Sequence, residues 1–282
     1  MNTEQKLEEK LEGIELVTSV TPEIMRSKMD EFVDRCVNFI QHSVDINESL
    51  DLIFPMNGSL MFMYLIQKKL PKHYHDKVNW VSAYRPDPED KRFYRFVHSK
   101  GKFSGKPVII DDMWDSGDSS EDISIAIAPE YSKETYAVTE LDVNNYTMSK
   151  GKFPIPVLVA TTKEGKPCDS AVFTFPFRER IDAWIASGFG LNCGKSSKRT
   201  ARYERLAGIC YAVTNLDTYM QMVSNETTRT KYEQILEGSG RICYGDDYDT
   251  MLDLLEQMDN EDLDLETRSK QLLLNLGLML EA

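Results

Sequence analysis

The residues best suited to chemistry lie in one short segment, Val108–Ser120. Three apolar residues open it, the adjacent carboxylates Asp111 and Asp112 follow, and a turn of small polar residues comes next. Adjacent carboxylates can accept hydrogen bonds from the vicinal hydroxyls of a sugar and help hold a hard cation such as Mg²⁺. The turn Asp115–Ser119 offers backbone N–H groups and hydroxyls at the start of an expected helix (120–128), where anions bind readily. The segment therefore predicts a ligand with a phosphate, a diol-bearing sugar and Mg²⁺. The alternative is a strand that ends in an ordinary Asp/Ser/Gly turn.

An α/β domain is the arrangement that would hold this segment in place. The apolar run 107–110 is typical of a strand buried on both faces, as in a parallel sheet. Further strands are expected at 50–54, 78–84, 136–141 and 155–160, and helices from Pro22 to about residue 42 and from the turn Pro55–Ser59 to about Leu70. Strands that alternate with helices predict a mostly parallel sheet flanked by helices. In such sheets, ligands bind at the carboxyl ends of the strands.

The sequence changes character after about residue 194. Helices are expected at 201–213, 247–258 and 265–280, with no strong strand between them. We therefore predict an acidic N-terminal segment (1–20), an α/β domain (21–194) and a helical C-terminal extension (195–282). Ten acids and no Lys or Arg occupy 246–266, whereas a basic cluster opens the extension: Lys195, Lys198, Arg199, Arg202 and Arg205. This basic cluster faces either the acidic stretch or a phosphate, and the sequence leaves both open.

The overall composition excludes several classes of protein. The chain has 282 residues, 41% of them hydrophobic, and 33 Lys+Arg against 46 Asp+Glu give a formal charge of −13. This acidity argues against a nucleic-acid surface, which needs clustered cations. No apolar run is long enough to span a membrane, and no signal peptide is visible, so we expect a cytoplasmic protein without a membrane partner. The five scattered cysteines predict reduced thiols rather than a disulfide framework or a zinc site.

The Asp-Asp segment resembles the PRPP-binding motif of type I phosphoribosyltransferases, in which two acids precede a Ser-Gly or Thr-Gly phosphate loop. Three other segments follow the order of that family. Ile53–Ser59 resembles its pyrophosphate loop, Val78–Lys106 its second strand and mobile loop, and Val157–Pro167 the lysine-bearing strand of the hypoxanthine-guanine and xanthine-guanine branch. The resemblance covers roughly residues 30 to 190. It implies a homodimer or tetramer that transfers ribose 5-phosphate from PRPP to a nucleobase, with Mg²⁺ and release of pyrophosphate, in purine salvage.

The resemblance also implies roles for individual residues. Asp111 and Asp112 would contact the ribose hydroxyls and hold Mg²⁺, and Asp115 would be the catalytic carboxylate that accepts or relays the ring proton of the base. Lys163 would orient the base by its exocyclic oxygen, although a solvated loop lysine is an equal alternative. The remaining contacts would be Ser116, Gly117, Asp118, Ser119 and Ser120 to the 5′-phosphate, Asn57 and Gly58 to pyrophosphate, and Phe177 and Trp184 stacked on the base.

Two residues depart from the family pattern. Asn57 stands where purine enzymes carry Lys or Arg, so a charge-assisted contact is missing. Asp118 stands where a neutral residue or Lys is usual, and a carboxylate beside a phosphate is repulsive unless it points away or meets a cation. These departures leave open a modified donor, weak binding, or a regulatory protein that binds PRPP or a nucleotide with little catalysis. Nicotinamide or a pyrimidine as the acceptor also stays open.

The segment Arg85–Lys106 is rich in positive charge. It carries seven basic residues, Arg85, Lys91, Arg92, Arg95, Lys100, Lys102 and Lys106, against three acids, Asp87, Glu89 and Asp90. A cationic mobile loop of this kind can close over pyrophosphate and exclude water. An exposed β-hairpin with solvated charges is the alternative, and the two descriptions are compatible.

Overall fold

The computed structural model of the chain describes residues 16–17, 22–56, 59–87, 93–111, 122–123, 126–127, 137–138, 157–161, 167–174, 202–203, 206, 212–213 and 226–279. The chain divides into two compact units. The first unit, which we call the α/β unit, comprises residues 32–176 and 260–282, and the second, the helical unit, comprises residues 1–31 and 177–259. These units differ from the three consecutive segments expected from the sequence, because the last part of the chain joins the α/β unit.

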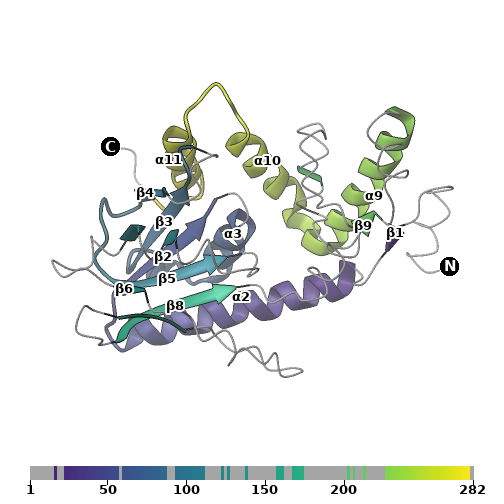
Figure 1. Cartoon of the computed structure of the whole chain (residues 1–282). Helices are drawn as coiled ribbons and strands as arrows, with labels where there is room; N and C mark the ends of the chain where they lie inside the picture. Colours follow the sequence, from purple (N-terminus) through teal and green to yellow (C-terminus); the bar gives the residue numbers. More distant parts are fainter. Residues whose placement is uncertain are drawn as a thin grey trace. The chain divides into compact units, whose positions relative to one another are not determined.

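A mostly parallel sheet forms the centre of the α/β unit (Figure 1). Its strand order is β4-β3-β2-β5-β8-β7-β6 in the part of the chain that the structure describes. The four strands β3, β2, β5 and β8 are parallel, whereas β4, β7 and β6 add antiparallel partners at the two sides. The bounds are β2 Leu50–Pro55, β3 Val78–Tyr84, β4 Arg95–His98, β5 Lys106–Asp111, β6 Ala137–Val138, β7 Val157–Thr161 and β8 Pro167–Thr174. The predicted α/β class is confirmed.

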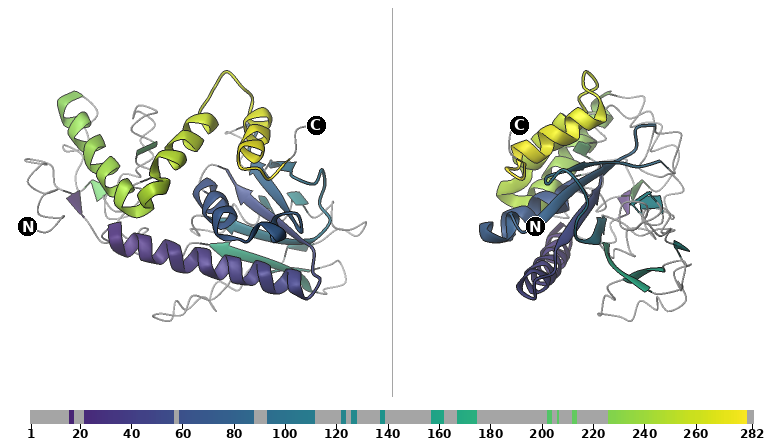
Figure 2. Two further views of the ribbon diagram at one scale, coloured as in Figure 1. Left: turned by 180° about the vertical axis from the view of Figure 1, so that it is seen from behind. Right: turned by 90° about the vertical axis from the view of Figure 1, so that its left-hand side faces the viewer.

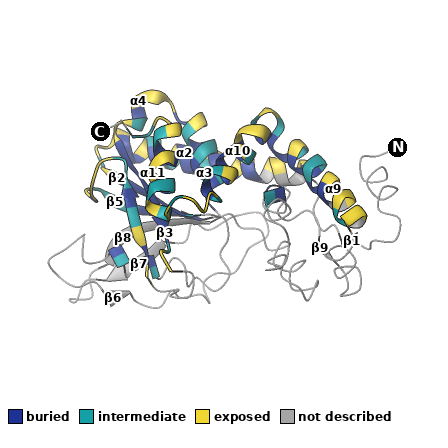
Figure 3. Cartoon of the chain, turned by 90° about the horizontal axis from the view of Figure 1, so that it is seen from above, coloured by how far each residue is buried: buried dark blue, intermediate teal, exposed yellow. Residues whose placement is uncertain are grey.

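The inner strands are buried on both faces, as their apolar runs predicted. Every residue of β2 and β3 is buried (Figure 3). On one face, Ile53, Val81 and Ile109 form a core cluster that also includes Ile123 and Ile127, from the described helical residues after β5. Elsewhere in the core, the ring of Phe54 stacks on Trp80, with ring centroids 5.9 Å apart. Burial on both faces explains why these strands read as continuous apolar runs instead of alternating ones.

Helices cover the sheet and connect its parallel strands. Helix α2 (Pro22–Asp45) precedes β2, while α3 (Leu60–Lys69) and the short α4 (Lys72–His75) connect β2 to β3. The rings of Phe32 and Phe62 meet edge to face at 4.8 Å and join α2 to α3. Helix α11 (Leu265–Asn275) packs against β3 and β4 and lies on the same face as α3 (Figure 2). Its end is fixed to α3, because Gln67 Nε2 donates to the carbonyl of Leu276 at 3.1 Å.

Two strands of the sheet lie outside the strand ranges expected from the sequence. β4 lies within the basic segment 85–106, for which a β-hairpin was the alternative, and it pairs with β3. β8 begins at Pro167 with a polar stretch, and its last four residues pair with Val108–Asp111 of β5. Pairing with a distant strand is a tertiary effect, so a local pattern could not reveal it.

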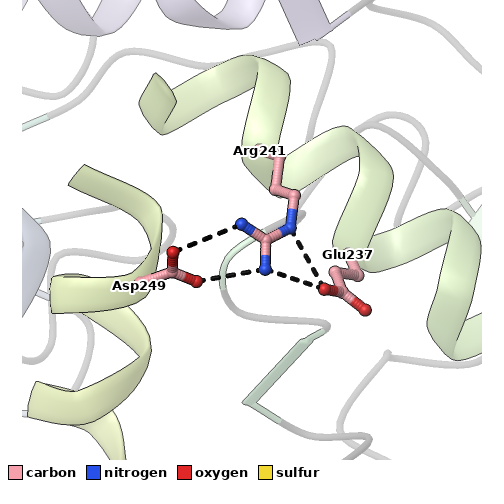
Figure 4. Close-up of polar contacts among 3 residues, drawn as sticks. All are labelled: Glu237, Arg241 and Asp249. Carbon is pink, nitrogen blue, oxygen red and sulfur yellow. Dashed lines mark hydrogen bonds and ion pairs between the residues drawn. The ribbon is translucent and has the colours of Figure 1, made fainter. Parts of the chain in front are cut away.

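The helical unit is built on α9 (Glu226–Tyr244) and α10 (Tyr248–Met258), joined by the 3₁₀ turn η2 (Gly245–Asp247). Arg241 of α9 binds Glu237 at 3.0 Å and Asp249 of α10 at 3.1 Å (Figure 4). For Arg202 the structure shows the first of the two alternatives, a contact with the acidic stretch, because its guanidinium binds Glu256 at 2.6 Å and Asp259 at 2.9 Å. These ion pairs tie the helices of this unit together.

Three expectations for the C-terminal region need correction. The predicted helix 201–213 does not reach its expected end, because Ala212–Val213 form β9 and pair antiparallel with β1 (Leu16–Val17). Helix α9 was not predicted, since its two glycines weaken the helical pattern. Helix α11 ends at Asn275 instead of 280, because Gly277 adopts a positive φ of 65° and Leu278 N donates to Leu273 O at 2.9 Å, which closes a Schellman motif.

Among the described residues, no helix is both long and apolar enough to cross a bilayer.

Candidate functional site

The site is set by the point where the strand order of the sheet diverges. From β2 the chain continues to β3, which lies on one side of β2 in the sheet. β5 lies on the other side of β2, and β8 lies beyond β5. Open α/β sheets bind ligands at such a divergence, at the carboxyl ends of the strands. β2 ends at Pro55 and β5 ends at Asp111. These are the two places where the sequence predicted a pyrophosphate loop and a PRPP motif.

The turn after β2 is anchored at both ends. Met56 N donates to Ala83 O of β3 at 2.7 Å, which extends the β2–β3 pairing by one hydrogen bond. Ser59 N donates to Pro55 O at 3.1 Å, and Ser59 O accepts from Met63 N at 3.0 Å. The turn therefore returns the chain directly into α3.

One side-chain hydrogen bond joins the two halves of the site. The hydroxyl of Ser59 donates to Oδ1 of Asp111 at 3.1 Å, and the pair is buried. Ser59 is fully buried and Asp111 is 6% exposed. A buried carboxylate must be hydrogen-bonded to remain charged at acceptable cost, and Ser59 supplies one such bond.

The oxygen chemistry of Asp111 fits a hard cation and a diol. A carboxylate offers about four acceptor positions, and Ser59 occupies one of them. Mg²⁺ prefers carboxylate oxygens and keeps several waters, so a single carboxylate with a neighbouring acid is a suitable donor set. Among the residues that the structure describes, no group of three or more His, Cys, Asp or Glu side chains forms a complete metal site.

Asp111 is the predicted site residue that the structure describes. The others lie outside the described residues, and their roles stay predictions: Asn57, Gly58, Asp112, Asp115, Ser116, Gly117, Asp118, Ser119, Ser120, Lys163, Phe177 and Trp184. Ser59 received no individual role from the sequence, although it ends the segment Ile53–Ser59 that resembles a pyrophosphate loop. The signal that could have revealed it is a serine just after one parallel strand and an aspartate at the end of the next.

The basic segment 85–106 has residues at both ends of the parallel strands, the amino ends and the carboxyl ends. Asn79 accepts from Lys100 N at 3.1 Å and donates to Lys102 O at 3.1 Å, at the amino end of β3. Lys106 is the first residue of β5 and lies at the same end of the parallel strands, opposite Leu50 of β2. Arg95, in contrast, pairs with Tyr84 at the carboxyl end of β3. Among the described residues of the segment, those near Arg95 lie at the carboxyl ends of the parallel strands, where Asp111 is found.

A cavity of about 620 Å³ opens at the carboxyl end of β3. Tyr84 and Arg95 line it together with residues from the segment that leads into α11, including Asp264, Glu266 and Arg268. Burial and the nearby carboxylate of Glu266 raise the pKa of Tyr84, while Arg95 opposes the shift. The lining includes neither Ser59 nor Asp111, so the cavity is separate from the Ser59–Asp111 contact.

Comparisons with known proteins give a limited result. No family model matches the chain, and no curated protein matches it. Among solved structures, the chain is similar to a hypoxanthine phosphoribosyltransferase from Staphylococcus aureus in an orthorhombic and a tetragonal crystal form. The identities are 14% and 16%, the TM-score is 0.29 in both cases, and 54% of this chain and 78% of that chain are covered. A TM-score this low does not establish a shared fold, so the function proposed below rests on the chain's own residues.

Proposed function

We propose that the α/β unit binds PRPP at the carboxyl ends of β2 and β5 and transfers its ribose 5-phosphate to a nucleobase, with release of pyrophosphate. One observation supports this proposal more than any other. The turn that resembles a pyrophosphate loop and the segment that resembles a PRPP motif follow adjacent parallel strands, and Ser59 of the first hydrogen-bonds Asp111 of the second. The two segments that resemble parts of one PRPP site therefore meet at the carboxyl ends of the parallel strands, where such sheets bind ligands.

The proposed reaction is a displacement at the anomeric carbon of the ribose. A ring nitrogen of the base forms a bond to this carbon while the bond to the pyrophosphate oxygen breaks, and Asp115 takes the proton from the base nitrogen. Asp111 and Asp112 hold the ribose hydroxyls, and the turn 116–120 holds the 5′-phosphate. Asp111 and Asp112 would hold Mg²⁺, which when bound would supply neutralisation of charge on the departing pyrophosphate. Water must be excluded, because it would compete with the base for the reacting carbon.

The acceptor in this proposal is a purine, which corresponds to a salvage reaction. The support for a purine is the sequence resemblance of 157–167. Nicotinamide and a pyrimidine are the other acceptors to test. The resemblance also implies a homodimer or tetramer.

The direct test is pyrophosphate release from purified protein with Mg²⁺, PRPP and a panel of bases. Asp115→Asn removes the proposed proton acceptor, so we expect turnover to fall by about 10²- to 10⁴-fold while PRPP binding, measured by calorimetry, is retained. Chelation of Mg²⁺ should weaken PRPP binding in both proteins. Unchanged turnover in Asp115→Asn would contradict the role given to this carboxylate.

The second candidate function is a PRPP- or nucleotide-binding regulator. Asn57 and Asp118 favour it, because both make the proposed phosphate contacts weaker than in the purine enzymes. A regulator would bind PRPP with Mg²⁺ and release no pyrophosphate with any base in the panel. The same two measurements therefore separate the candidates.

A further inference from the structure

We infer that the cavity at the carboxyl end of β3 binds guanine or its nucleoside guanosine, at a site separate from the reaction proposed above. The cavity has a volume of about 620 Å³, which lies within the roughly 300–1,000 Å³ typical of small-molecule pockets. All its lining residues belong to the α/β unit, and neither Ser59 nor Asp111 is among them. The inference therefore does not depend on the proposed transfer of ribose 5-phosphate.

The alternation of side chains along β3 and β4 places two residues at this cavity. Tyr84 of β3 pairs with Arg95 of β4, and both line the cavity. Their neighbours Ala83 and Phe96 also pair with each other, and they pack in the core cluster that contains Ile109. Because successive side chains of a strand point to opposite faces, Tyr84 and Arg95 lie on the other face, where α11 packs against the two strands (Figure 2).

An exposed aromatic ring lies next to Arg95. Phe93 is 49% exposed, and the guanidinium of Arg95 lies 5.3 Å from the centroid of its ring. Among the described residues, the other exposed large hydrophobic side chain is Ile46, at 55%. Unpaired nucleobases stack on aromatic rings and on the planes of arginine guanidinium groups. Phe93 and Arg95 therefore offer a stacking surface for a planar ligand.

Two charged groups of the lining are available to a ligand. Three others are held by nearby residues: Asp264 by Thr267, Glu266 by Lys270, and Arg268 by the carbonyl of Leu263. The carboxylate of Asp262 and the guanidinium of Arg95 differ from these. Within the described part of the chain, neither makes an ion pair or a side-chain hydrogen bond. One cation and one carboxylate therefore remain for recognition.

A cation and a carboxylate together match the edges of guanine. Arginine donates two hydrogen bonds to the guanine acceptors O6 and N7, and a carboxylate such as Asp262 accepts from N1–H and N2–H₂ on the adjacent edge. Adenine has a donor, N6–H₂, where guanine has O6, and an acceptor where guanine has N1–H. Both contacts would then be repulsive, so the lining favours guanine over adenine.

The charge of the lining disfavours a phosphate. Among the described residues, four acids and two arginines line the cavity. A phosphate dianion beside this excess of negative charge is repelled, whereas a base or a nucleoside has no net charge. The ligand is therefore the free base or the nucleoside, and the nucleotide is excluded.

Calorimetry with guanosine, adenosine and GMP tests the site in the purified full chain without PRPP. Guanosine should bind at least about tenfold more tightly than adenosine or GMP, because each competitor meets repulsion. Asp262→Asn should weaken guanosine binding by about tenfold or more, because a charged acceptor is lost. Phe93→Ala should weaken it by about fivefold or more, because base stacking is lost.

Two matched variants control for general effects. Asp76→Asn changes another exposed aspartate, and Ile46→Ala truncates the other exposed large hydrophobic side chain. Both should bind guanosine within about twofold of wild type. Thermal unfolding of each variant shows whether it is folded, and Asp262→Asn, at an exposed position, tests the site even if Phe93→Ala does not fold.

Three binding results would overturn the inference. The first is absence of guanosine binding to the wild-type protein at millimolar concentration. The second is equal guanosine affinity in wild type, Asp262→Asn and Phe93→Ala. The third is binding of adenosine or GMP as tightly as guanosine.

Pyrophosphate release separates this site from the proposed reaction. Asp262→Asn should leave turnover and the KM for the acceptor base unchanged. A raised KM for the base would make the cavity part of the acceptor site and would overturn the inference of a separate site. A wild-type protein that binds guanosine as described but releases no pyrophosphate would refute the proposed transfer reaction alone.

Discussion

The N-cap residue of α11 shows how one carboxylate can fix a helix end. Asp264 accepts from Thr267 N at 2.8 Å and from Thr267 Oγ1 at 3.2 Å. The pKa of Asp264 is lowered from its ordinary value of 3.8, and the largest cause is the hydrogen bond from the backbone N–H of Thr267. A carboxylate at this position also complements the positive end of the helix dipole.

We expect Asp264→Ala to lower the thermal unfolding midpoint of the α/β unit at neutral pH. Because the folded-state pKa is lowered, the stabilisation is fully present above pH 3.8 and is lost as the pH falls through the folded value. The difference in midpoint between wild type and variant should therefore shrink below about pH 4. The exposed neighbour Asp262 is the control, and Asp262→Ala should have a much smaller effect. A difference that stays constant down to pH 2 would contradict this account.

At the scale of elements, the α9–α10 crossing depends on a single glycine. A Cβ on Gly240 would lie 2.5 Å from Cε2 of Tyr248, whereas a Cβ on Gly238 would meet nothing within 4 Å. Tyr248 is 1% exposed, and the guanidinium of Arg241 lies 4.6 Å from its ring centroid, so the ring has little room to move. The glycine at 240 therefore lets the two helices approach.

We expect Gly240→Ala to destabilise the protein by roughly 1–3 kcal/mol through overpacking. The matched variant Gly238→Ala should be neutral or stabilising by about 0.5–1 kcal/mol, because alanine is the better helix former at an open position. Chemical denaturation of both variants measures the difference. If Gly238→Ala and Gly240→Ala changed the stability equally, the contact with Tyr248 would not be the cause.

At the scale of the whole molecule, the chain crosses between its two units more than once. The α/β unit is completed by residues 260–282, which follow the segment of the helical unit. Leu272 of α11 is fully buried in the first unit, and Leu254 of α10 is 4% exposed in the second. Each unit therefore has its own core residues in the last part of the chain.

We expect each leucine to report on its own unit. Leu272→Ala should cost about 2–5 kcal/mol and increase hydrogen exchange in peptides from β3, because α11 packs on that strand. Leu254→Ala should increase exchange in α9 and α10 and leave β3 protected. Loss of protection in both units with either variant would show that they unfold as one.

The sequence by itself determined the class of the sheet, and it predicted where along the chain a ligand site lies. Continuous apolar runs predicted the strands at 50–54, 78–84 and 107–110, because residues buried on both faces need no polar alternation. The carboxylates and small residues after them predicted where a ligand would bind. These are local signals, carried by neighbouring residues.

Only the tertiary structure decided which segments meet. The pairing of β8 with β5 and the return of α11 to β3 join residues far apart in the sequence, and no local pattern encodes them. The contact of Ser59 with Asp111 is of the same kind, since it requires β2 and β5 to lie side by side. Composition and spacing indicate which groups can do chemistry. The strand order decides which of these groups lie close together, because it sets which strands have their carboxyl ends side by side.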